Sequence, residues 1–266
     1  SLETAAVFAA RLVVEDKPYT DLFTATADNC PTFANGQFQG GTCQGAPTQA
    51  GVLTNPGLMA QYYANMAFRR VRFVQETFVC TKFPAEYAAT PTPMGAGQYT
   101  SPWPFTSITG GEGSRINFQD TSSVICANCH TTMNHVAPLF ANFDMNGGFN
   151  GGQIQVETPV VSNDANVRRT RLTDWLPEGQ GTAWRNGKAV ANLAELGAAM
   201  AQDPDVHACA VHRVWNWAFS RGDIVGDLAT VPPSVSAALV ADFKANNFNL
   251  KRVIRATFTG PDFVRF

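Results

Sequence analysis

The sequence predicts a mainly α protein with long loops and a small β element. Apolar residues recur at helical spacing in several segments, and capping residues or prolines precede many of them. One short stretch instead alternates between apolar and polar residues, as a strand does. The 266 residues suit one large domain or two modest ones. We expect a helical and loop region over 1–118 and a second helical region over 119–266, packed as one compact unit.

The first half is predicted to hold two helices. Residues 1–14 place apolar side chains on one face, and residues 24–56 are loop-like because they are rich in Gly, Asn, Thr and Pro. The strongest helical pattern runs over 57–82, where three arginines supply the polar side. Five prolines and several glycines then make residues 84–115 an irregular crossing.

The second half continues the helical pattern. A helix is expected to begin near residue 120, where four capping residues stand together, and a short helix over 138–143 ends at paired glycines. Alternation over 154–160 predicts a strand or hairpin. The remaining helices are expected over 189–202, 204–220, 232–246 and 250–258.

The charge content is low for a globular protein. Charged residues make up 15% of the chain, against about 25% in a typical soluble domain. A net charge of −2 argues against a nucleic-acid partner, which needs a basic face, and the apolar content argues against disorder. No apolar run reaches the roughly 18 residues of a transmembrane segment.

Six cysteines divide into a close pair and four others. Cys30 and Cys43 bracket a Gly- and Asn-rich loop, and closing such a loop is worth roughly 3 kcal/mol. Cys80 and Cys209 would then form a second disulfide. The alternative is four buried free thiols in a cytosolic protein.

The close pair belongs to the sequence Cys126-Ala-Asn-Cys129-His130, which is the attachment pattern of c-type haem. Two thiols three residues apart on a helical turn can reach the two vinyl groups at one haem edge, and His130 then projects toward the iron. We therefore expect one covalent haem c, with His130 as the proximal iron ligand, in a metal-binding, cytochrome c-like helical domain.

Other chemistries fit this motif less well. A zinc site usually has a second close pair of ligands, which the sequence lacks. A thioredoxin-like Cys-x-x-Cys would follow a strand in a βαβ unit, and no such unit is predicted. A structural disulfide or a chance match are the remaining alternatives.

The sixth iron ligand stays open at this point. Met133 and His212 are the main candidates, although Met133 lies on the proximal side if the helix continues past His130. His212 belongs to an aromatic-rich helix that could cover a haem. An open sixth position would instead favour ligand binding or peroxidase-like chemistry.

Several segments resemble the planctomycete-type multidomain c-type cytochromes, whose haem signature is Cys-x-x-Cys-His-x-x-Met. The resemblance rests on Phe68-Arg69-Arg70, Phe-Val-Cys80-Thr-Lys-Phe-Pro84, the haem motif with Met133, Asn142-Phe143-Asp144 with Gly147, and Cys209, Arg213, Trp215 and Arg221. Asn134 and His135 depart from the Asp-Pro of that signature. The resemblance implies a bacterial, exported haem protein, supports pairing Cys80 with Cys209, and keeps Met133 as a ligand candidate.

Together these observations predict an exported monohaem c-type cytochrome, periplasmic or extracytoplasmic, that transfers single electrons and acts as a carrier more than as a catalyst. The alternatives are a haem enzyme with an open distal iron site and a structural subunit with an incidental haem. We expect redox partner proteins, no nucleic acid and no transmembrane segment. The charge-poor composition also predicts a subunit of a larger complex.

Overall fold

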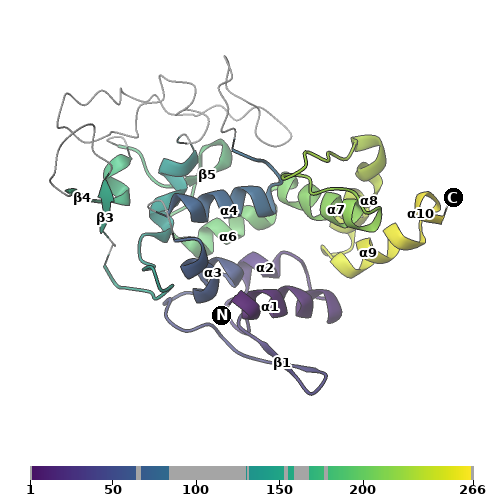
Figure 1. Ribbon diagram of the computed structural model, residues 1–266, viewed down its shortest axis with the longest axis horizontal. Helices are drawn as coiled ribbons and strands as arrows, with labels where there is room; N and C mark the ends of the chain where they lie inside the picture. Colours follow the sequence, from purple (N-terminus) through teal and green to yellow (C-terminus); the bar gives the residue numbers. More distant parts are fainter. Residues whose placement is uncertain are drawn as a thin grey trace, which may run out of the picture.

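The computed structural model describes residues 2–63, 67–83, 130, 132–152, 155–158, 168–176 and 179–264. These residues are mostly helical with short strands, which confirms the predicted fold class at the level of mainly α. In Figure 1 the N-terminal helices lie below the centre of the view, where α4 (Phe68–Phe78) and α6 (Leu193–Gln202) are drawn, and the C-terminal helices lie to one side.

The N-terminal layer starts with α1 (Leu2–Val14), as predicted. Its buried face carries apolar residues three and four positions apart, which is the spacing of an amphipathic helix. The layer also contains α2 (Asp21–Thr24), the short 3₁₀ helix η1 (Gly51–Thr54) and α3 (Pro56–Gln61). Asn55 caps α3, because its side chain accepts the Leu58 N–H.

The predicted loop over 24–56 contains a hairpin that we did not expect. Strands β1 (Thr32–Ala34) and β2 (Gln37–Gln39) pair antiparallel around Asn35-Gly36. Both turn residues have positive φ, at 53° and 76°, and an Asn-Gly pair between short strands favours such a turn.

The single helix predicted over 57–82 is wrong, because the structure has two helices there. The first, α3, ends at Gln61, and α4 (Phe68–Phe78) begins after Ala67, which has a left-handed backbone at φ 65°. A right-handed helix cannot run through that conformation, so α4 begins only after Ala67. The helix α6 (Leu193–Gln202) begins at the N-cap Asn192 and packs against α2 and α7 (Pro204–Ala218).

Short β elements surround this centre. The alternation over 154–160 corresponds to a hairpin of β3 (Gln155–Thr158) and β4 (Arg168–Arg171). Two-residue strands β5 (Ala183–Trp184) and β6 (Lys188–Ala189) form a further pair, and the start predicted for the next helix at 189 is therefore too early. The expected helix over 138–143 is the 3₁₀ helix η2 (Ala137–Phe140).

The C-terminal helices follow the sequence prediction closely. They are α7 (Pro204–Ala218), α8 (Pro233–Ala245) and α9 (Leu250–Thr259), followed by the short α10 (Pro261–Val264). Asp203 caps α7 by accepting the Asp205 N–H, and proline occupies the first turn. These helices share a C-terminal cluster of Ala210, Val211, Val214, Phe243 and Val253.

The main core cluster extends from Ala5 on α1 to Val206 on α7. It combines residues from both sides of the predicted boundary at 118/119, which itself lies outside the described residues. The predicted crossing over 84–115 and the helix start near 120 also fall outside them. No helix within the described part is long and apolar enough to cross a membrane.

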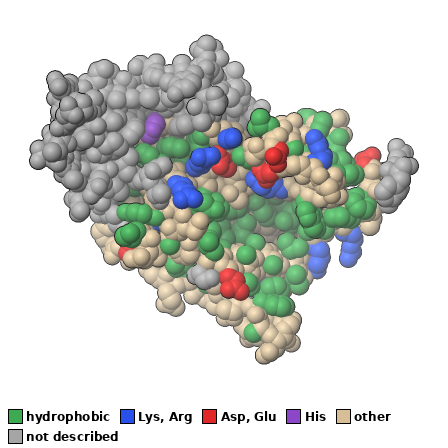
Figure 2. Space-filling view, in the orientation of Figure 1, with side chains coloured by type: hydrophobic (Ala, Val, Ile, Leu, Met, Phe, Trp, Pro, Cys, Tyr) green, Lys and Arg blue, Asp and Glu red, His purple; other side chains and the backbone are tan. Residues whose placement is uncertain are grey.

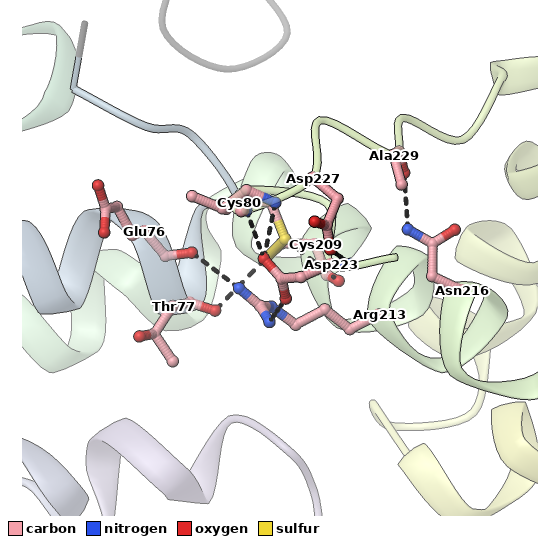
Figure 3. A network of polar contacts seen from close by, with 11 residues as sticks. Glu76, Thr77, Cys80, Cys209, Arg213, Asn216, Asp223, Asp227 and Ala229 are labelled. Carbon is pink, nitrogen blue, oxygen red and sulfur yellow. Dashed lines mark hydrogen bonds and ion pairs between the residues drawn. A yellow bond between two sulfur atoms is a disulfide. The ribbon is translucent and has the colours of Figure 1, made fainter. Parts of the chain in front are cut away.

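Both predicted disulfides are present. Cys30–Cys43 closes the N-terminal loop, and Cys80–Cys209 joins the end of α4 to α7 across 129 positions of sequence. Arg213 reinforces the connection made by the Cys80–Cys209 disulfide. Its guanidinium donates to the Glu76 carbonyl at 3.1 Å and pairs with Asp223 at 2.6 Å (Figure 3).

Hydrogen bonds and an ion pair also connect the start of α9 to residues at and just after the end of α1. The Tyr19 amide donates to the Phe248 carbonyl at 2.8 Å, and Lys251 donates to the Val14 carbonyl at 2.8 Å. The Lys251 ammonium also pairs with Asp16 at 2.6 Å. The start of α9 is therefore bound to the segment that follows α1.

Candidate functional site

The proposed haem-binding residues lie at the edge of the described chain. Cys126 and Cys129 fall outside the described residues, and His130 falls within them. Residues 132–136 are helical and continue directly into η2. The placement of His130 is thus set by this helix and by the helices packed against it.

His130 is oriented by a side chain one helical turn further on. Its Nδ1 lies 3.1 Å from Oδ1 of Asn134. An amide oxygen only accepts hydrogen bonds, so Nδ1 carries the proton and the ring's lone pair is on Nε2. Asn134 is itself buried, at 1% exposure, which holds the acceptor in place. A histidine that binds a metal through one nitrogen commonly donates from the other in this way.

The surroundings of His130 keep the ring neutral. Phe68, the first residue of α4, meets it edge to face, with ring centroids 5.0 Å apart. Burial lowers the pKa of His130, and the hydrogen bond to Asn134 opposes this only in part. A neutral imidazole with its lone pair on Nε2 is the form that binds haem iron.

Arg70 holds the chain that follows His130. Its side chain is 1% exposed and donates to backbone carbonyls of two segments, at 2.9 Å to Phe143 and 2.6 Å to Met59. Further bonds reach Phe140 and Asp144. Burial lowers its pKa to about 10, so the guanidinium is still charged at neutral pH. The prediction that Arg70 lies on the polar side of the helix is therefore wrong.

Two buried polar side chains, one two residues after His130 and one on α4, have unused hydrogen-bonding groups. The hydroxyl of Thr132 and both amide atoms of Gln75 on α4 have no hydrogen-bond partner in the part of the chain that the structure describes. Such groups are uncommon inside proteins, because leaving them unpaired costs free energy. Thr132 is two residues from the predicted haem ligand, and Gln75 is on the helix whose first residue contacts that ligand, which fits a site that receives a further group with polar atoms.

The two candidates for the sixth ligand are separated by the structure. Met133 is half-buried and packs against the main core cluster. His212 lies on α7, where its Nε2 is 2.9 Å from the Ser236 hydroxyl of α8. His212 therefore bonds to a residue of the C-terminal helices, and burial lowers the pKa of its imidazole.

The expectation that the chain is metal-binding is contradicted within the described residues. No three or more His, Cys, Asp or Glu side chains among them gather closely enough to hold a metal ion. His135 and His207 bond instead to Gln180 and to the Ala201 carbonyl. This finding concerns ions chelated by several side chains, whereas a haem supplies four iron ligands from its own ring.

The chain was also compared with known proteins. No protein-family model matches it, and no curated protein or solved structure gives a significant match. The assignment of a function therefore rests on the motif and on the geometry around His130.

Proposed function

We propose that this protein is an exported c-type cytochrome that transfers single electrons. One haem c would be bonded to Cys126 and Cys129, with His130 as the proximal iron ligand. The resemblance to planctomycete-type multidomain cytochromes points to the same function. When bound, the haem supplies the one-electron couple of its iron.

The hydrogen bond between His130 and Asn134 is the observation that carries this proposal. It assigns the proton to Nδ1 and the lone pair to Nε2, and it makes Nε2 the more basic of the two as a ligand. Burial keeps the ring unprotonated, as the lowered pKa shows. This tautomer and charge state are those that a proximal haem ligand requires.

The residues after His130 would exclude water from the iron site. Val136 and Phe140 have no exposed surface, and Leu139 is 8% exposed. An apolar, dry surrounding is one of the means by which a protein tunes a haem's reduction potential. Arg70 holds this segment in position through the Phe140 and Phe143 carbonyls.

Mass spectrometry under denaturing conditions tests the proposal directly. The chain, produced with the c-type haem-attachment machinery, should carry the mass of one covalent haem, and Cys126→Ser/Cys129→Ser should carry none. Cys30→Ser/Cys43→Ser is the matched control, because it also removes two cysteines and should keep the haem. A wild-type mass without haem would reject the proposal.

A haem enzyme with an open distal site is the second candidate. The hydrogen bond between His212 and Ser236 favours this candidate, because it occupies Nε2 of one of the two residues expected as the sixth iron ligand. The optical spectrum separates the candidates, since CO leaves a six-coordinate electron-transfer haem unchanged and shifts the bands of an open one.

We also propose an extracytoplasmic location and a larger assembly. Two disulfides are typical of proteins that fold in an oxidising compartment. The face in Figure 2 shows charged side chains scattered among many hydrophobic and neutral ones, and Trp217 is 65% exposed. Surfaces of this kind are typical of subunits with partners. Elution as a monomer from the native source, with no co-purifying protein, would argue against the assembly.

A further inference from the structure

We infer that Gln75 on α4 is a haem-binding residue whose side-chain amide donates a hydrogen bond to a haem propionate. This inference rests on the proposed function and names a contact that the haem motif itself does not reveal. It starts from a polar side chain that is 1% exposed and whose two amide atoms lack a partner within the described residues.

Helix geometry places Gln75 on the same side of α4 as the contact with His130. Phe68, which meets the His130 ring, precedes Gln75 by seven residues. Seven residues of α-helix turn the chain to within about 20° of the starting direction and advance it by about 10 Å. Gln75 therefore lies further along the edge of α4 that begins at the proposed iron ligand.

The chemistry of the amide selects the part of the haem that it can contact. Outside the iron and its axial ligands, the propionate carboxylates are the strong hydrogen-bond acceptors of a haem, and the Gln75 Nε2 group is a donor. Arg72 is a surface neighbour of both Phe68 and Gln75 on the helix, at spacings of four and three residues. Its positive charge favours a carboxylate at this edge, although it also pairs with Glu76 at 2.8 Å.

An ordered water would be the competing partner for Gln75. A water would be present with or without haem, so Gln75→Met would change the stability of both forms alike. A propionate is present only with the haem, so the same substitution should act oppositely on the two forms.

The test compares Gln75→Met in the haem-loaded protein and in the haem-free Cys126→Ser/Cys129→Ser chain, by urea unfolding. Gln75→Met should raise the urea midpoint of the haem-free chain, because it removes an unpaired buried amide, and lower that of the loaded protein. Gln49→Met is the control, since Gln49 is a buried glutamine that already accepts from Thr54 and Asn29. It should lower both midpoints. Equal changes for Gln75→Met in the two backgrounds would overturn the inference.

A second measurement applies if the haem-free chain does not fold. Gln75→Met should lower the reduction potential of the loaded protein, because the less compensated carboxylate favours ferric iron, whereas Gln49→Met should leave it unchanged. An unchanged potential in Gln75→Met would overturn the assignment.

Mass spectrometry of the wild type is done first. A chain without haem rejects the proposed function, whereas a haem-bearing chain in which Gln75→Met has no specific effect rejects only this contact.

Discussion

Arg70 shows how one residue can determine the placement of a whole segment. All its hydrogen bonds go to backbone carbonyls, and these come from α3 on one side and from the segment after His130 on the other. A lysine at this position could not make these bonds, because lysine lacks the planar array of donors.

The first prediction concerns this residue. Arg70→Met should destabilise the protein by at least about 3 kcal/mol, because it leaves several buried carbonyls without a donor. Urea unfolding measures the change. Arg69→Met is the control on the same helix, since Arg69 is exposed and lies over the Tyr62 ring. It should cost less than about 1 kcal/mol. Similar losses in the two variants would contradict the role given to Arg70.

Asn134 gives a prediction about the proposed iron ligand. Asn134→Leu removes the acceptor for Nδ1 of His130 while keeping similar volume. The proximal ring then loses its fixed tautomer and orientation, and we expect the reduction potential of the haem-loaded protein to shift. Protein-film voltammetry measures it. Asn142→Leu is the control, because Asn142 bonds to the Asn150 carbonyl in an exposed turn; an equal shift there would contradict the assignment.

His207 predicts how stability depends on pH. Burial lowers its pKa below the ordinary value of 6.5, and its buried Nδ1 has no partner among the described residues. The unfolded chain therefore takes up a proton more readily than the folded one, and stability should fall as pH decreases below about 6.5. His207→Phe, which keeps a ring beside Phe248, should flatten this dependence in urea titrations from pH 7.5 to 5. An unchanged slope would exclude His207 as a cause.

At the scale of elements, a close approach of α6 to α2 depends on one glycine. A Cβ at Gly197 would collide with the carbonyl oxygen of Phe23. Replacing glycine inside a helix by alanine normally stabilises by about 1 kcal/mol, whereas here the collision separates two packed helices.

Gly197→Ala should therefore destabilise the protein by about 1–3 kcal/mol despite its better helix propensity. Thermal unfolding followed by far-UV circular dichroism measures this. Gly151→Ala provides the control, because no atom lies within 4 Å of the added Cβ there. A rise in the melting temperature of Gly197→Ala would show that α6 can move away from α2 without loss.

The elements also show what sequence patterns can predict here. The start of α7 was predicted correctly because Asp203-Pro204 is a local capping pattern. The start of α4 follows the left-handed Ala67, and alanine carries no local indication of that conformation. The β1–β2 hairpin could have been found, since Asn35-Gly36 is a turn pattern that we read only as part of a loop.

The candidate site also contains some features that the sequence predicts and others that it does not. The motif at 126–130 and the spacing of His130 and Asn134 by one helical turn are visible in the sequence. The burial of Arg70 and Gln75 is not, because it is produced by tertiary packing of α4 against segments distant in sequence. A buried cation or amide cannot be distinguished from an exposed one by residue type alone.

At the scale of the whole molecule, the two disulfides should contribute unequally. Cys80–Cys209 spans 129 positions and Cys30–Cys43 spans 13. In the chain-entropy model the longer loop restricts the unfolded state more, by roughly 2 kcal/mol. Cys80→Ser/Cys209→Ser should therefore lose more stability in urea than Cys30→Ser/Cys43→Ser does. The reverse order would indicate that native contacts around Cys30 outweigh loop closure.

The bond between the start of α9 and the segment after α1 also affects when the protein can fold. The Tyr19 backbone amide donates to the Phe248 carbonyl, and the Lys251 ammonium donates to the Val14 carbonyl. Contacts between such distant residues close late and slow the folding of a chain. Residues up to Lys251 must therefore be synthesised before these contacts can form. The N-terminal layer of a newly made chain would therefore lack these contacts until α9 has been synthesised.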